Sequence, residues 1–249
     1  MATGGHVKAL LNLGLHDPNI IGRPNVVTTL MEDTSGPWME YFAHKDARDQ
    51  QGQFMADAYL SLIKGRTIIA EAPTGLGKTA ASLASALAAM KQSENVKKIL
   101  FLTGRQSQHK IVIDTVRKLN DNRKDHPNVA IVDLIGRESM CGKLTIDRQC
   151  FCEEGVSEKA RGGRRSQLKR WILEWPRHVE ETVKNGRIEG TCPYMCCIEA
   201  AREAEIIVMD YNHVFVESVS DSSLPSMSID VGSSICLLYT SDAADDSRS

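Results

Sequence analysis

The stretch "IIAEAPTGLGKTAASL" (residues 68–83) decides the fold that the sequence predicts. A short apolar run ends at a turn that contains Pro and Gly, and an Ala- and Leu-rich segment follows. Glycines in such a turn let successive backbone N–H groups face an anion. The positive end of the next helix dipole would add to that attraction. The stretch therefore predicts a strand, a phosphate-binding loop and a helix.

The segment "APTGLGKT" (residues 72–79) matches the phosphate-loop pattern, with Ala at the position of the first Gly. Lys78 is expected to reach the β- and γ-phosphates and Thr79 to ligate Mg²⁺, so these two are the candidate catalytic residues. A chance turn is the alternative, but the flanking strand and helix argue against it. The loop backbone that would hold the phosphates belongs to Thr74, Gly75 and Gly77.

Further segments continue the alternation of strands and helices. Buried strands are expected at residues 66–72, 97–103, 128–136 and 204–211. Helices are expected at residues 50–64, 78–91 and 107–119, from apolar spacing and Ala and Leu content. Such alternation implies a parallel sheet with helices on its faces, so the predicted fold class is α/β.

Composition and charge limit the classes of partner. The 249 residues are 42% hydrophobic and carry a net charge of −2, so any site for a polyanion must be a local patch. No apolar run approaches the ~20 residues of a membrane helix, and no membrane partner is expected. The start, "MATGGHVKALLNLGLHDP", lacks the basic and apolar regions of a secretory signal. An intracellular protein is expected.

Residues 137–203 break the pattern and contain six of the seven cysteines. In a reducing compartment, cysteines favour metal or cluster ligation over disulfides. We interpret this segment as an insertion that needs an internal cross-link, because it shows little apolar periodicity. The candidate ligands are Cys141, Cys150, Cys152 and Cys192.

The two middle ligands are the open question in this set. Cys150 and Cys152 are separated by one residue, closer than expected for middle ligands, and Cys196 and Cys197 are also near. Either of the latter could replace a middle ligand. The favoured interpretation is that they are small buried residues on a helix at 195–203.

The same insertion carries a localised positive charge. Residues 159–187 hold nine Lys or Arg and three Glu, a local net charge of +6. This segment predicts helices interrupted at Pro176 and a surface for a phosphate backbone. A solvated helix face is the alternative. Trp171 and Trp175 could stack on bases, although buried anchors are the favoured interpretation. The candidates for phosphate contact are Arg164, Arg165, Lys169 and Arg170.

Motifs around the phosphate loop occur in an order found in one helicase family. The segment "ARDQQGQFM" (residues 47–55) puts Gln51 20 residues before Glu71. Later come "ILFLTGRQSQHKIVIDTVRKL" (99–119), "GTCPYM" (190–195) and "IIVMDYNHVF" (206–215). Over roughly residues 45–235, the ordered set resembles the XPD-like iron–sulfur DNA helicases of superfamily 2.

This resemblance implies a domain organisation. The fold would be a RecA-like P-loop helicase domain 1, incomplete, with an inserted iron–sulfur cluster domain. The implied divisions are a loosely ordered lead-in at 1–47, motor domain 1 at 48–136 and again at 204–235, the cluster insertion at 137–203, and a non-native tail at 236–249.

The resemblance also implies cofactors and residue roles. Gln51 would read the adenine of ATP, because its amide both donates and accepts, and Arg48 would assist. The internal cross-link of residues 137–203 would be a 4Fe–4S cluster, with Cys141 and Cys192 as the firmest ligands. Zinc suits four thiolates equally well by number, although Cys-x2-Cys pairs are absent. The further DNA contacts implied are Thr103, Arg105 and Gln108 to the backbone and Tyr194 to a base.

The implied activity is that of an ATP-dependent 5′→3′ DNA helicase acting on single-stranded DNA and a DNA fork, in DNA repair. Repair or transcription complexes would be its partners. It would be nuclear in a eukaryote, or cytoplasmic and nucleoid-associated in a prokaryote. Two alternatives remain: a nucleotide- and DNA-binding fragment without turnover, and a zinc-containing P-loop ATPase.

The last residues do not fit the family pattern. A linker should lead into an apolar strand that ends in Asp-Glu-Ala-His, but "CLLYTSDAADDSRS" (residues 236–249) follows instead. This string resembles translated sequencing-adapter read-through. A truncated N-terminal fragment, inactive alone, is therefore expected. A genuine acidic tail is the alternative, and the residues not taken as the missing acids are Asp242, Asp245 and Asp246.

Overall fold

The computed structural model describes residues 6–13, 35–73, 75–141 and 152–239. The chain forms two compact units, which are described separately. Unit 1 comprises Met1–Phe101 and Asp230–Ser249, and unit 2 comprises Leu102–Ile229. The expected insertion at 137–203 falls within unit 2, and its boundaries stay a prediction.

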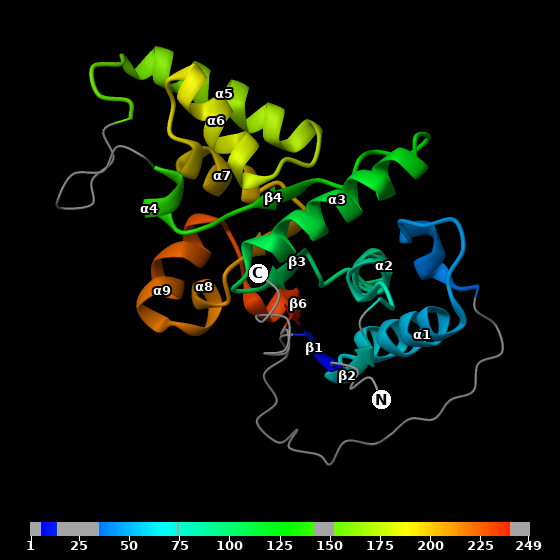
Figure 1. The fold of residues 1–249 in the computed structure, drawn as a ribbon. Helices are drawn as coiled ribbons and strands as arrows, with labels where there is room; N and C mark the ends of the chain where they lie inside the picture. Colours follow the sequence, from blue (N-terminus) through cyan, green and yellow to red (C-terminus); the bar gives the residue numbers. More distant parts are fainter. Residues whose placement is uncertain (1–5, 14–34, 74, 142–151, 240–249) are drawn as a thin grey trace, which may run out of the picture. The chain divides into compact units, whose positions relative to one another are not determined.

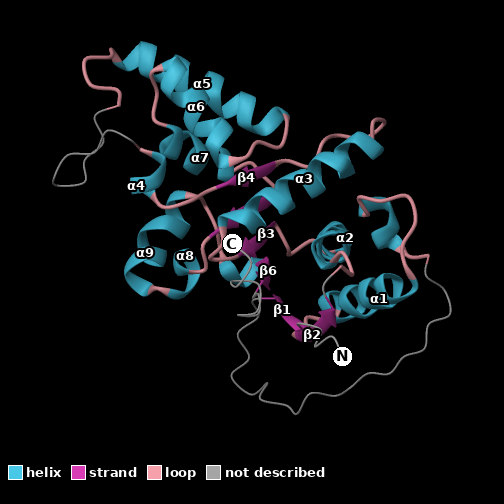
Figure 2. Ribbon diagram, viewed as in Figure 1, coloured by secondary structure: helices cyan, strands magenta, loops and turns pink. Residues whose placement is uncertain are grey.

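Unit 1 contains a group of strands whose order is β2-β1-β6-β3. The strands are β1 (His6–Leu13), β2 (Ile68–Pro73), β3 (Lys98–Leu102) and β6 (Ser234–Tyr239). β1 pairs antiparallel with β2 and with β6. The helices of this unit are η1 (Pro37–Tyr41), α1 (Asp49–Ile63), α2 (Lys78–Gln92) and η2 (Val231–Ser233) (Figures 1 and 2).

Helices α1 and α2 pack side by side and form the core of unit 1 (Figure 1). Alanines at 80, 81, 84, 86, 88 and 89 are buried, and such small side chains let α2 lie close to its neighbours. Leu62 of α1 and Leu87 of α2 are fully buried. The Ser85 hydroxyl donates to the Met55 carbonyl at 3.0 Å and ties the helices together. Both helices were predicted from the sequence.

The segment before α1 differs from the expected lead-in. Trp38, Tyr41 and Phe42 are buried, and the Trp38 and Tyr59 rings lie 5.4 Å apart. Residues 37–43 are therefore folded onto α1 and α2 rather than loosely ordered. The aromatic residues cluster in a single 3-10 turn, which is too short to show a helical repeat in the sequence.

The strand before the phosphate loop is also different from the prediction. Ile69 of β2 is 65% exposed, and the strand pairs antiparallel with β1. The expected fully buried strand with parallel neighbours is therefore wrong for β2. An apolar run shows that a strand can be covered on both faces, but it does not identify the strand that pairs with it.

Unit 2 contains the parallel strands β4 (Ile131–Asp133) and β5 (Ile206–Met209), with Ile131 opposite Ile206. This pairing agrees with the predicted α/β class, although both strands are shorter than expected. Its helices are α3 (Gln106–Asn122), α4 (Arg137–Met140), α5 (Glu158–Glu174), α6 (Val179–Glu189), α7 (Pro193–Ala201), α8 (Asn212–Phe215) and α9 (Glu217–Ser226).

The predicted helix break at Pro176 is confirmed. Helix α5 ends at Glu174 and α6 begins at Val179. The ring of Pro176 removes a backbone donor, and its carbonyl accepts a bond from Arg117 Nε at 3.0 Å. The His178 side chain caps the new helix by accepting from the Glu180 N–H.

Buried polar groups fix β4 between α3 and α6. Asp133 is 2% exposed, and its Oδ1 lies 2.5 Å from His109 Nδ1 on α3. Its other oxygen accepts the Val179 N–H at 2.8 Å. The Asn120 amide bonds both the N–H and the carbonyl of Val129 at 2.9 and 3.2 Å. These bonds fix the position of β4, which the apolar pattern of the sequence alone does not determine.

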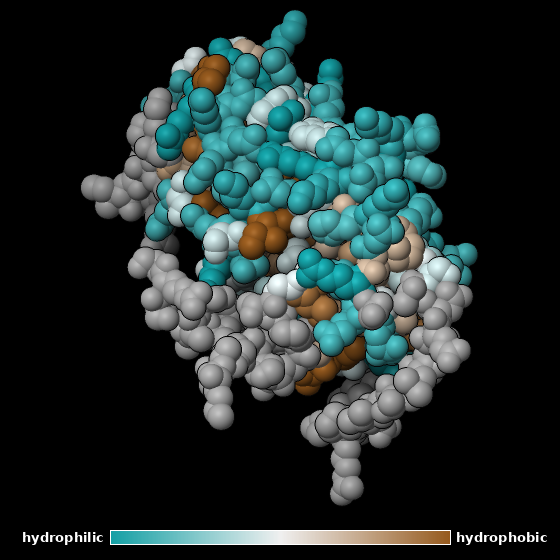
Figure 3. All heavy atoms as spheres, turned by 45° about the vertical axis from the view of Figure 1, so that its right-hand side comes forward, coloured by the Kyte–Doolittle hydropathy of each residue, from teal (hydrophilic) through white to brown (hydrophobic). Residues whose placement is uncertain are grey.

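The described surface is mainly hydrophilic on the face drawn in Figure 3, where apolar residues form separate spots. Within the described residues, no helix combines the length and the apolar character needed to span a membrane.

Asn120→Ala is expected to lower the free energy of unfolding by roughly 2 kcal/mol, because the buried Val129 N–H and carbonyl would lose their partners. Urea unfolding followed by circular dichroism measures the change. Asp121→Ala, at an exposed position on the same helix, should alter stability by less than about 0.5 kcal/mol. Equal effects of the two substitutions would contradict the role of Asn120.

Candidate nucleotide and metal sites

The phosphate loop turns from β2 into α2 through two glycines with left-handed backbone. Gly75 has φ +88° and Gly77 has φ +76°, a region that side chains with a Cβ rarely adopt. Gly77 is the N-cap of α2, so Lys78 and Thr79 start the helix. Thr74 lies outside the described residues. The loop therefore has the strand–turn–helix context that the motif requires.

Gln51 lies against this turn, as its predicted role in nucleotide binding requires. Its side chain is 5% exposed, and its Nε2 is 2.3 Å from the place that a Cβ on Gly77 would occupy. Its Oε1 accepts the Arg48 N–H at 3.1 Å. The Arg48 guanidinium in turn donates to the Gly75 carbonyl. Two residues that precede the loop by more than 20 positions therefore meet its two glycines.

Lys78 and Thr79 are each 6% exposed at the start of α2. The Thr79 hydroxyl is hydrogen-bonded to Tyr239, the last residue of β6. Burial raises the pKa of the Tyr239 hydroxyl, an effect that the bond to Thr79 partly offsets. A threonine hydroxyl is a hard oxygen of the kind that Mg²⁺ accepts, so the residue type fits the predicted metal role.

Three predicted ligands meet in unit 2: Cys141 after α4, Cys152 in a turn, and Cys192 at the N-cap of α7. Their Sγ atoms all lie within 4.8 Å of one another, and those of Cys141 and Cys152 are 3.2 Å apart. Cys150 lies outside the described residues. Segments separated by up to 51 positions thus bring three thiols to one point.

This donor set fits a soft metal centre. Thiolates bind iron–sulfur clusters and zinc alike. A cavity of about 340 Å³ borders the cysteine group at Cys152. Its other lining residues are Met140, Gly186, Arg187, Gly190, Thr191 and Pro193.

Cys196 and Cys197 have a different environment. Both are fully buried on α7, where Cys197 Sγ is 3.8 Å from the Asp133 carbonyl and Cys196 Sγ is 3.9 Å from Thr191 Oγ1. Burial raises the pKa of the Cys196 thiol to about 12 and also raises the pKa of Cys197. Neither sulfur belongs to the group formed by Cys141, Cys152 and Cys192 within the described residues, so both thiols suit a packing role.

Glu153 was not singled out in the sequence, yet it touches the thiol site. Its carboxylate accepts from the Cys192 N–H at 3.2 Å and from Thr191 Oγ1 at 2.6 Å. Burial would raise the pKa of this carboxyl, but hydrogen bonds from Arg165, Thr191 and Cys192 lower that pKa to about 2. The only sequence signal was an acidic residue beside a candidate ligand.

Comparison with protein families assigns the chain to a family. Residues 49–144 match the family described as DEAD/DEAH box helicase. Residues 101–243, more than half of the chain, match the DEAD_2 family. The chain belongs to the DEAD_2 family. The two matches together span the phosphate loop, the three assembled cysteines and strand β5.

Solved structures show which fold this DEAD_2 chain resembles. It aligns with a structure described as XPD helicase at 20% identity and a TM-score of 0.51, over 78% of this chain and 32% of that one. A structure described as truncated XPD gives 18% identity and a TM-score of 0.42, over 70% and 47%. The chain thus spans about a third of the XPD helicase chain, and the predicted XPD-like α/β helicase fold is confirmed.

The basic residues of α5 in this DEAD_2 chain have unequal surroundings. Arg164 and Arg170 are exposed, and Arg164 donates to the Gly190 carbonyl at 3.3 Å. Lys169 pairs with Glu203 at 2.7 Å. Arg165 is engaged with Glu153 and Glu199, so in this arrangement its guanidinium is turned to protein carboxylates. Trp171 is half-buried and stacks on Arg177, 4.1 Å from its ring centre.

The remaining candidates for DNA contact surround the start of α3 and α7. Thr103 is buried and its N–H donates to the Met209 carbonyl at 3.1 Å, which limits its access to a ligand. Arg105 is the N-cap of α3, and Gln108 is half-buried in the first turn. Tyr194 is half-buried, with Arg137 at 5.7 Å from its ring centre. Their contacts with DNA stay predictions.

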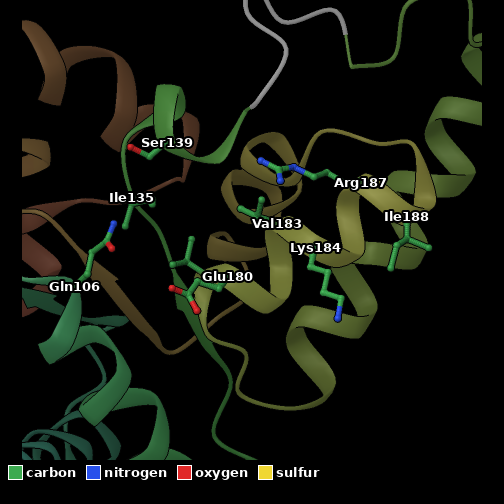
Figure 4. A pocket seen from close by; sticks show the side chains of 9 residues that line it. Gln106, Ile135, Ser139, Glu180, Val183, Lys184, Arg187 and Ile188 are labelled. Carbon is green, nitrogen blue, oxygen red and sulfur yellow. The ribbon is translucent and has the colours of Figure 1, made fainter.

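An open groove of about 500 Å³ lies between the start of α3, the β4–α4 connection and α6. Figure 4 shows Gln106 and Ser139 on one side and Lys184 and Arg187 on the α6 side. The lining is mixed. Glu180, Lys184 and Arg187 carry charge, whereas Ile135, Val179, Val183 and Ile188 are apolar.

Gly77→Ala is expected to weaken ATP binding on the order of tenfold, because its Cβ would need left-handed backbone and would displace Gln51. Gly163→Ala is the matched control, since a Cβ there meets nothing within 4 Å. Titration of each variant with ATP measures the effect. Unchanged affinity in Gly77→Ala would contradict the geometry assigned to the loop.

Proposed function

We propose that this DEAD_2 chain is the nucleotide-binding half of an ATP-dependent, XPD-like DNA helicase motor that moves 5′→3′ along a single strand. The observation that carries the proposal is the contact between Gln51 and the Gly77 turn. A glutamine amide offers both a donor and an acceptor, which matches one edge of adenine. The phosphate loop provides the second half of the same ligand site.

The loop residues divide the work of holding ATP. Backbone N–H groups at the left-handed turn and the N-terminus of α2 attract the phosphates. Lys78 would neutralise charge on the β- and γ-phosphates, and Thr79 would hold Mg²⁺, which would supply further positive charge at the phosphates. Arg48 supports the turn through the Gly75 carbonyl. The first motor domain thus grips the nucleotide, while hydrolysis needs groups from a second lobe.

The three cysteines that lie close together support the proposal of a 4Fe–4S cluster. Its ligands would be Cys141, Cys152, Cys192 and, as the fourth, Cys150. When bound, a cluster would cross-link segments that lie far apart in the sequence. Zinc is the second candidate, because sulfurs at ~2.3 Å from a tetrahedral ion lie about 3.8 Å apart. The observed spacing within 4.8 Å suits that ion as well.

The basic face of α5 and the groove beside α6 support binding of single-stranded DNA near a fork. Phosphate contacts dominate such binding, so it should tolerate different sequences and weaken with salt. For the whole protein we infer a second motor lobe, a role in DNA repair and partners in repair or transcription complexes. Its location would be nuclear, or cytoplasmic and nucleoid-associated.

Lys78→Ala is expected to abolish unwinding in a protein that extends this chain through the second motor lobe, because the transferred phosphate would lose its charge partner. A forked duplex with a 5′ single-stranded tail is the substrate. Lys91→Ala, at an exposed position at the end of the same helix, should unwind like the wild type. Unwinding by Lys78→Ala at the wild-type rate, or a preference for 3′ tails, would contradict the proposal.

A further inference from the structure

One buried carboxylate connects two of the three assembled ligands. Glu153 directly follows Cys152 in the chain and is 7% exposed. It accepts hydrogen bonds from Thr191, which precedes Cys192, and from the Cys192 N–H itself. The carboxylate therefore holds the backbone beside one thiol against the backbone of the other.

Arg165 of α5 completes this contact. Its Nε donates to the two Glu153 oxygens at 2.9 and 3.1 Å, and its Nη2 donates to one of them at 2.5 Å. Its Nη1 lies 3.4 Å from Glu199 of α7. A planar guanidinium matches a carboxylate through two parallel bonds, which fixes orientation as well as distance. A rigid helix thus anchors a turn that contains no regular structure of its own.

The charge of Arg165 is needed as much as its shape. A buried carboxylate is strongly unfavourable without a partner. Arg165 removes this penalty, since it pairs with Glu153 at the point where the ligands converge. The ion pair therefore lets a buried acidic residue lie beside the group of cysteines.

We propose that Glu153 and Arg165 are positioning residues that hold Cys152 and Cys192 ready for a metal centre before it binds. This proposal rests on the metal site proposed above. Preorganisation lowers the ordering cost of binding, and groups that orient metal ligands in this way typically change affinity 10- to 100-fold. It also gives Arg165 a role different from the phosphate contact predicted from the basic segment.

Titration of the whole metal-free chain with Cd²⁺ tests this proposal, because the soft ion reports thiolate ligation through its ultraviolet charge-transfer absorption. Glu153→Gln keeps the size of the side chain but removes its charge, and should weaken Cd²⁺ binding by about 10- to 100-fold. Arg165→Lys keeps the charge but loses the paired bonds, and should weaken it by about tenfold.

Two further variants calibrate the titration. Glu203→Gln breaks the exposed ion pair between Glu203 and Lys169, which lies on α5 like Arg165. This variant should bind Cd²⁺ like the wild type. Cys192→Ser removes one of the proposed ligands and should weaken Cd²⁺ binding and lower the absorption. Circular dichroism of each metal-free variant shows whether its helices are retained. If Glu153→Gln loses helix content, Arg165→Lys tests the positioning role in its place. Its Cd²⁺ release rate, measured with a competing chelator, should then exceed that of the wild type.

The outcomes separate the two proposals. If Cys192→Ser binds Cd²⁺ more weakly while Glu153→Gln and Arg165→Lys bind it as tightly as Glu203→Gln, the positioning role is wrong and the metal site stands. If the wild-type chain shows no thiolate absorption with Cd²⁺, both proposals fail. Weaker Cd²⁺ binding in Glu153→Gln and Arg165→Lys, with helix content retained, supports the positioning role.

Discussion

The left-handed backbone at Gly75 and Gly77 is the constraint on which the nucleotide site depends. Only glycine adopts this conformation without strain, and a side chain at Gly77 would occupy the place taken by Gln51. The turn therefore determines where α2 begins, how Lys78 and Thr79 are presented and how closely α1 approaches. A single backbone requirement links the phosphate and adenine halves of the proposed ATP site.

The thiol site depends on polar contacts in a comparable way. Glu153, Arg165 and Thr191 connect its segments, in addition to the apolar packing of α5 against α7. Asp133 plays a similar part nearby, where it joins α3, β4 and α6. Unit 2 thus carries its chemistry on a framework of buried ionic and hydrogen-bonded groups, which specify position more strictly than apolar packing does.

The sequence predicted the features that follow from local chemistry. The glycine turn, the Ala-rich α2 and the break at Pro176 need no distant partner. The antiparallel partner of β2 and the folding of Trp38 onto Tyr59 depend on contacts that periodicity does not reveal. The pairing of Glu153 with Arg165 was missed for the same reason, because a basic run reads as a surface for phosphates until a buried carboxylate is found beside it.

The measurement that most directly tests the metal centre proposed for this DEAD_2 chain is elemental analysis of the chain purified without oxygen. We expect about four iron and four acid-labile sulfide per chain, with broad visible absorption, as a 4Fe–4S cluster requires. One zinc per chain without iron or sulfide would contradict the cluster and favour the zinc-containing alternative.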